Sequence, residues 1–171
     1  MASHQKQLEA ILFPARPKTN WTRYPLCEVA DFMNWKYLDA YNGMFRTSLK
    51  DQFSDEALST RKLSAADAAI FLFACILREH RWPYDEICRH IGIFKEGVSA
   101  YKEDRQKGRP GPWMLMLNSS VAGADALLRG PDENSRPLHT FGPAGYWLSI
   151  EAVLALLQQL DNKLNAEPQD L

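Results

Sequence analysis

The chain has 171 residues, of which 46% are hydrophobic and 24% charged, and its net charge is −1. This is the composition of an ordinary globular protein, so wholesale disorder is excluded, and the near-zero charge provides no global basic field for nucleic acid. Three cysteines are too few for a disulfide framework, which favours a reducing compartment. The longest apolar run, Ala68–Leu77, is about half of the ~20 residues that a membrane span needs. We therefore expect a cytoplasmic protein with no membrane segment.

The charges are distributed unevenly along the chain. Residues 1–60 contain as many basic as acidic residues, whereas residues 61–112 contain ten basic and seven acidic ones. Residues 113–171 contain three basic and seven acidic residues. A basic middle and an acidic end predict two surfaces that meet different partners.

The first third of the chain predicts helices and a polar loop. A short helix is expected over residues 3–13. From Leu26 to about Thr47 an apolar stripe then follows helical spacing, and its residues are Leu26, Val29, Ala30, Met33, Tyr37, Tyr41 and Met44. Periodicity leaves open whether this second stretch is one helix or two with a bend near Asn34. Residues 48–63 are polar and predict a loop.

The middle of the chain predicts a buried helix followed by a helical pair. Ser64 and Asp67 form a variant of the capping box before a helix over residues 65–81, which is apolar on nearly all sides. Pro83 ends it, a short helix follows at 84–91, and Gly92 occupies a turn before a helix at about 94–105.

The last third of the chain predicts a small α/β region. Residues 106–112 are rich in Gly and Pro and form a boundary, after which the apolar residues 113–117 predict a strand. A short helix at 120–129 and a second strand at 138–141 are expected next. The final helix, capped by Ser149, has a broad Leu/Ile/Val face that favours a homodimer.

Together these elements predict a mainly α protein in three regions. Residues 1–63 form an N-terminal helical region and residues 64–107 a three-helix core. Residues 108–171 form a small α/β C-terminal region that ends in an amphipathic helix. The apolar spacing around Gly92 resembles the helix-turn-helix of DNA-binding regulators, in which the second helix enters the major groove. The three-helix form of this motif occurs in recombinase and sigma-factor domains.

This resemblance implies a set of DNA contacts on and after the second helix. Residues 89–109 contain six basic and three acidic residues, a local positive footprint for phosphates. Two features depart from the motif, because Gly97 weakens the proposed recognition helix and Glu96 places an acid in the groove. The candidate DNA-binding residues are Lys95, Glu96, Ser99, Lys102, Arg105, Lys107 and Arg109.

A second, mutually exclusive alignment uses an earlier part of the chain. The sequences YPLCEVADFMNWKYLDAY (24–41), RKLSAAD (61–67) and WPYDEICRHI (82–91) resemble the mercury-resistance-regulator family, which begins with a winged helix-turn-helix. The resemblance implies DNA contacts by Lys36, Arg61 and Lys62. The family's Arg-Tyr-Tyr element is replaced here by DAYN (39–42), and the wing lacks its glycine.

No signature of an enzyme or of a metal site emerges. The chain has no phosphate-binding loop, no dinucleotide fingerprint and no nucleophile elbow, and its histidines and cysteines lack ligand spacing. We therefore expect a non-enzymatic, sequence-specific, DNA-binding transcriptional regulator, dimeric through its last helix, with double-stranded DNA as partner and no cofactor. The alternative is a protein-interaction module, such as an inhibitor or adaptor, that does not bind DNA.

Overall fold

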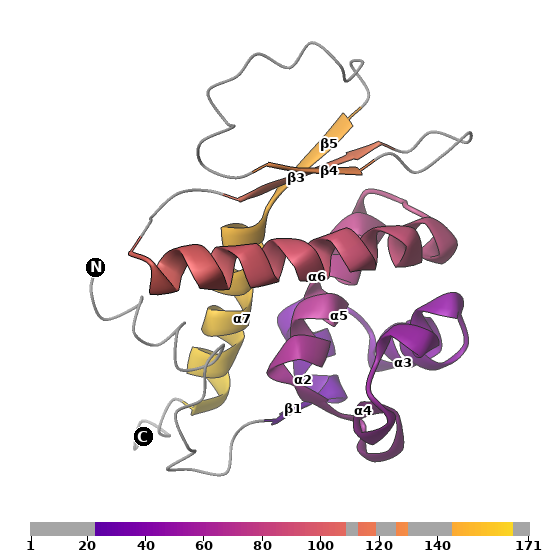
Figure 1. Ribbon diagram of the computed structural model, residues 1–171. Coiled ribbons are helices and arrows are strands. Elements are labelled where there is room, and N and C mark those ends of the chain that lie inside the picture. Colours follow the sequence, from indigo (N-terminus) through magenta and orange to yellow (C-terminus); the bar gives the residue numbers. More distant parts are fainter. Residues whose placement is uncertain (1–22, 109–112, 119–125, 130–144, 166–171) are drawn as a thin grey trace.

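The structure is a computed structural model that describes residues 23–108, 113–118, 126–129 and 145–165 (Figure 1). They form a mainly helical protein with two small antiparallel sheets, which confirms the expected fold class at this level. Within these ranges, no helix is both long and apolar enough to cross a bilayer. The elements are β1 (Arg23–Pro25), α2 (Leu26–Phe32), α3 (Tyr37–Phe45), the 3-10 helix η1 (Ser48–Gln52), α4 (Asp55–Thr60), β2 (Lys62–Ser64), α5 (Ala65–Glu79), α6 (Tyr84–Gln106), β3 (Met114–Asn118), β4 (Ala126–Arg129), β5 (Gly145–Ser149) and α7 (Ile150–Asn165).

Helix α5 is the central helix of the core, as its sequence predicts. The Ser64 hydroxyl accepts a hydrogen bond from the Asp67 amide at 3.1 Å, and the Asp67 carboxylate accepts one from the Ser64 amide at 3.4 Å. The predicted capping box is therefore confirmed. Ten of the fifteen residues of α5 are buried, so the helix is surrounded by the rest of the chain. It ends at Glu79, ahead of Pro83.

The two-stranded sheet of β1 and β2 places residue 61 beside the beginning of α2. Strands β1 and β2 pair antiparallel, with the buried residues Tyr24 and Leu63 opposite one another. Directly beyond the pair, the Leu26 amide donates to the Arg61 carbonyl at 2.9 Å. The helices α2 and α3 therefore belong to a loop of chain whose two ends are hydrogen-bonded together.

The segment between these strands is more helical than predicted. Two helices, α2 and α3, replace the single long helix that periodicity left possible, and the bend lies at Asn34. The predicted loop at 48–63 is wrong, since it contains η1, α4 and the first residues of β2. The helices η1 and α4 are short and polar. Each buries one residue, Leu49 in η1 and Ala57 in α4. So few buried positions leave no readable period in the sequence.

The predicted turn at Gly92 is wrong, because residues 84–106 form one uninterrupted helix, α6. Gly92 is exposed in the middle of this helix. The buried side chains of Ile87, Ile91 and Phe94 follow helical spacing across it, and the Phe94 ring stacks on Phe73 of α5 at a centroid distance of 4.4 Å. Residues 65–105 are thus two helices, and the predicted three-helix core is not confirmed.

A three-stranded antiparallel sheet lies against α6, with β3 between β4 and β5 (Figure 1). The strand predicted at 113–117 is confirmed as β3. The predicted helix at 120–129 is wrong at residues 126–129, which pair with β3 as β4. The strand predicted at 138–141 and the helix predicted at 3–13 lie outside the described residues.

The last helix, α7, is an internal part of the fold. Its Ser149 cap is confirmed, because the Ser149 hydroxyl accepts from the Ala152 amide at 3.3 Å. The apolar stripe, which includes Val153, Leu154 and Leu157, is buried, and α7 packs on α5 and α6. Since this stripe is covered by the same chain, it does not supply the free face that suggested a homodimer. Dimerisation stays a prediction.

Candidate nucleic-acid interface

The residues first predicted to contact DNA are in the second half of α6 and just beyond it. Lys95, Glu96 and Ser99 are exposed, and the Ser99 hydroxyl donates to the Lys95 carbonyl at 3.1 Å. Lys102 is half-buried, and Arg109 lies outside the described residues. The structure therefore brings only part of this set to one surface.

Two further members of the set are engaged with neighbours on their own helix. The Arg105 Nε atom donates to the Tyr101 hydroxyl at 3.0 Å, and its guanidinium lies 5.2 Å from the centroid of that ring. Lys107 pairs with Glu103 at 3.5 Å. Both cations would have to leave these partners, or share them, in order to meet a phosphate.

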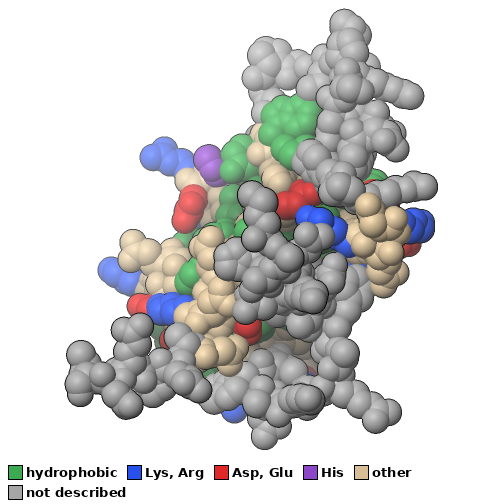
Figure 2. All heavy atoms as spheres, turned by 90° about the vertical axis from the view of Figure 1, so that its left-hand side faces the viewer, with side chains coloured by type: hydrophobic (Ala, Val, Ile, Leu, Met, Phe, Trp, Pro, Cys, Tyr) green, Lys and Arg blue, Asp and Glu red, His purple; other side chains and the backbone are tan. Residues whose placement is uncertain are grey.

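The exposed part of α6 is a narrow stripe of mixed charge. Helix α6 has η1 and α5 packed against it, and the strands β3 and β4 pack on it as well. Figure 2 looks at the molecule from the end of α6, and in its described part the basic and acidic side chains are interspersed. The exposed positions of α6 are Asp85, Arg89, Gly92, Lys95, Glu96, Ser99, Glu103 and Gln106. This stripe lacks the excess of cations that phosphates favour.

Two short helices joined by a tight connection, α2 and α3, lie earlier in the chain. The two helices pack on each other and are joined by four residues, Met33 to Lys36. Asn34 in this turn has a φ of 56°, a left-handed conformation that asparagine tolerates better than most residues. The Trp35 amide donates to the Ala30 carbonyl at 2.8 Å, and the Trp35 ring packs edge-on against Phe71 of α5. The turn is therefore anchored to the core.

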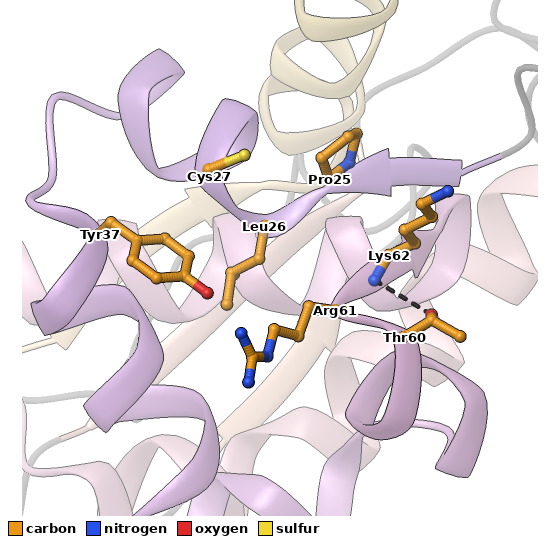
Figure 3. Close-up of a pocket in the computed structure, with 7 residues that line it drawn as sticks. All are labelled: Pro25, Leu26, Cys27, Tyr37, Thr60, Arg61 and Lys62. Carbon is orange, nitrogen blue, oxygen red and sulfur yellow. Dashed lines mark hydrogen bonds between the residues drawn. The ribbon is translucent and has the colours of Figure 1, made fainter.

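An open pocket lies between the beginnings of α2 and α3 and the chain that leads into β2. Figure 3 shows the Tyr37 hydroxyl and the Arg61 guanidinium pointing toward one another across it. Arg61 itself has a φ of 56° and ends α4 in a left-handed conformation. The lining residues are Pro25, Leu26, Cys27, Tyr37, Thr60, Arg61 and Lys62. Arg61 thus points toward the first residue of α3, whereas Lys62 lines the same pocket but extends its side chain away from Tyr37 (Figure 3).

Aromatic rings along α3 hold this side of the helix in place. Tyr37 and Tyr41 have centroids 6.2 Å apart, and Tyr41 stacks on Phe45 at 4.6 Å. The Arg61 guanidinium lies over the Tyr41 ring, 5.4 Å from its centroid. A cation–π contact of this kind fixes the direction of Arg61 without neutralising its charge.

The opposite side of α3 is held by a close approach to α6. A Cβ atom on Gly43 would lie 2.5 Å from the hydroxyl oxygen of Tyr84, so any larger residue here requires the Tyr84 side chain to shift. The Tyr84 ring is in turn covered by the Arg78 guanidinium, 4.7 Å from its centroid. Burial raises the pKa of the Tyr84 hydroxyl, which stays protonated. With Gly43 facing the core, the start of α3 faces outward.

The exposed apolar residues at the start of α3 were missed by the sequence analysis. Leu38 is 65% exposed and Tyr37 is 41% exposed. The only other large hydrophobic residue that is exposed in the described part of the chain is Trp147. Tyr37 belongs to the apolar stripe predicted for this helix, but α3 buries Ala40, Gly43 and Met44. Leu38 lies off that stripe, and this is the feature of the sequence that could have indicated its exposure.

No second kind of site competes with this one in the described ranges. There, no three His, Cys, Asp or Glu side chains gather as the ligands of a metal ion would. No family model matches the chain, and neither the curated proteins nor the solved structures contain a match to it.

Proposed function

We propose that this protein is a DNA-binding transcriptional regulator that docks on duplex DNA through α2 and α3. The observation that carries the proposal is the arrangement of this segment: two helices joined by a four-residue turn, enclosed by two strands that pair with each other. In such motifs the second helix enters the major groove with its first residues toward the bases. The start of α3 is exposed, as that role requires.

The same arrangement supports the resemblance to the mercury-resistance-regulator family. The three stretches that resemble the family are α2 with α3, β2 with the start of α5, and the start of α6. One departure is that residues 48–60, between α3 and β2, contain the short helices η1 and α4. The backbone contacts of a wing would here fall to the residues that follow α4.

Three exposed cations are the proposed phosphate contacts. Lys36 is the N-cap residue of α3, and Arg61 and Lys62 border the pocket beside it. Phosphate contacts supply most of the affinity of such proteins and position the helix, whereas base contacts select the sequence. Helix α2 carries Glu28 and Asp31, and Asp39 is an exposed acid on α3 itself. A carboxylate there opposes phosphates but can accept a hydrogen bond from a cytosine amino group.

The test compares two double variants that remove the same charge from different surfaces. Arg61→Ala with Lys62→Ala changes the proposed interface, and Lys95→Ala with Lys107→Ala is its matched control on α6. All four side chains are exposed, so both variants should fold like the wild type. Fluorescence anisotropy with a random-sequence duplex in low salt should show roughly tenfold weaker binding by the first variant and no change in the second. The reverse result would place the contacts on α6.

A protein-interaction module remains the second candidate function, because Tyr37 and Leu38 form an exposed apolar surface on a protein of near-neutral charge. This candidate predicts no binding to duplex DNA even in low salt. It also predicts a protein partner whose retention is lost in Leu38→Ala. The anisotropy measurement on the wild type therefore separates the two functions before any variant is made.

A further inference from the structure

The first turn of α3 combines exposed apolar side chains with a near absence of groups that can pair with base edges. Its residues are Tyr37, Leu38, Asp39 and Ala40. None of them is an Arg, Lys, Asn or Gln, the side chains that form bidentate hydrogen bonds with guanine or adenine. The carboxylate of Asp39 and the Tyr37 hydroxyl are the polar groups of this turn, and Leu38 is its most exposed large side chain.

Tyr37 has an aromatic neighbour, and cations lie on one side of this turn. Tyr37 lies against Tyr41, which carries the Arg61 guanidinium on its face. Lys36 precedes the turn, and Lys62 borders the same pocket as Tyr37 (Figure 3). An apolar surface meant for a protein core would not need this positive border, whereas a surface that approaches a polyanion does.

Only one base presents an apolar group in the major groove. The edges of guanine, adenine and cytosine offer hydrogen-bond donors and acceptors, while thymine adds a 5-methyl group to its acceptor. An apolar side chain that is pushed into the groove therefore gains most where it meets that methyl group. We infer, on the basis of the proposed function, that Tyr37 and Leu38 read thymine methyl groups, so that the preferred sites contain thymine at the positions that face the first turn of α3.

The experiment removes the methyl group without changing base pairing. The full-length protein first selects duplexes from a random pool, and one enriched duplex is resynthesised with deoxyuridine in place of each thymine in turn. Loss of one buried methyl group should weaken binding about fourfold, at one or two thymines and not at the others. In Leu38→Ala or Tyr37→Ala the same replacement should have no effect at the thymine that the missing side chain contacts. Trp147→Ala, which removes an exposed apolar residue from β5, is the matched control and should keep the full effect.

The experiment distinguishes a failure of the proposed function from a failure of the inference about thymine. If no duplex is enriched, the proposed function fails together with this inference, and a protein partner for the same surface is favoured. If duplexes are enriched and bind equally well with deoxyuridine at every position, the protein binds DNA and the inference is overturned. If the effect of deoxyuridine persists unchanged in both α3 variants, thymine is read by another part of the chain, which also overturns it.

Discussion

At the scale of single residues, the placement of α3 depends on the contact between Gly43 and Tyr84. Gly43→Ala gains about 1 kcal/mol of helix propensity, but a Cβ atom 2.5 Å from the Tyr84 hydroxyl must displace that ring from Arg78. Overpacking of this kind costs about 1–3 kcal/mol, so we expect a net loss of roughly 1 kcal/mol. Urea denaturation measures it. Tyr84→Phe in the same chain should restore most of the loss, and a Gly43→Ala variant more stable than wild type would contradict the contact.

The burial of His90 predicts that the free energy of unfolding depends on pH. The side chain is 1% exposed, and neither ring nitrogen has a hydrogen-bond partner in the described structure. Burial lowers the pKa of His90 below its ordinary value of 6.5, so the unfolded chain binds a proton more readily than the folded one. The neutral, buried His90 side chain stabilises the folded state above pH 6.5. This stabilisation declines as the pH falls from 6.5 toward the folded-state pKa, because the unfolded chain is protonated first.

The change can be measured by urea denaturation at pH 7.5 and pH 5.5. We expect the wild type to lose up to ~1 kcal/mol over this interval because of His90. His90→Leu cannot be protonated and should lose correspondingly less. Equal losses in the two proteins would mean that His90 is hydrogen-bonded or hydrated in solution.

At the scale of elements, the continuity of α6 is tested by Gly92→Ala. In the structure Gly92 is an exposed helical position, and an added Cβ has no atom within 4 Å. Alanine should therefore stabilise the protein by about 0.5–1 kcal/mol. If Gly92 formed a left-handed turn, the same substitution would destabilise it instead, and thermal unfolding distinguishes the two signs.

Elements with local signals were predictable from the sequence, and those decided by packing were not. The capping box at Ser64 and Asp67 and the cap at Ser149 are short-range hydrogen bonds whose partners are three residues apart. Gly92 was misread because a glycine fits both a turn and an exposed helical position. The spacing of Ile87, Ile91 and Phe94 across it is the signal that one helix continues.

The candidate interface shows the same division. Lys36, Arg61 and Lys62 are predictions from a family resemblance, which does not depend on which side of a helix is buried. Tyr37 follows the helical spacing of apolar residues, a pattern that is typical of a buried face, and yet it is exposed. The inner face is decided by Gly43 and its fit against Tyr84, a contact between residues 41 positions apart that periodicity cannot show.

At the scale of the whole molecule, α7 links the C-terminal part of the chain to the elements around α2 and α3. It follows β5 without a break and ends beside the first elements, where Lys163 pairs with Asp31 at 2.8 Å. The Tyr24 hydroxyl donates to the Asp161 carboxylate at 3.2 Å. Burial raises the pKa of the Tyr24 hydroxyl and of the Asp161 carboxyl, so this contact is partly shielded from water, whereas the Lys163–Asp31 pair is exposed.

This arrangement predicts that α7 and the α2–α3 segment unfold together. Leu154 is fully buried, and Leu154→Ala should cost about 2–4 kcal/mol of stability for the entire protein. Far-ultraviolet circular dichroism and tryptophan fluorescence should report one shared transition in urea. Gln159→Ala, at an exposed position of the same helix, is the control and should change stability by less than about 0.5 kcal/mol. Two separate transitions would show that α7 is an independent unit.

The central claim, that the exposed start of α3 faces DNA, is tested most directly by hydroxyl-radical footprinting of the protein with and without duplex DNA. The three exposed large hydrophobic residues of the described chain, Tyr37, Leu38 and Trp147, supply both the probe and its internal reference. We expect DNA to protect Tyr37 and Leu38 from oxidation and to leave Trp147 as reactive as before. Protection of Trp147 or of the exposed stripe of α6, with Tyr37 and Leu38 still reactive, would contradict the account.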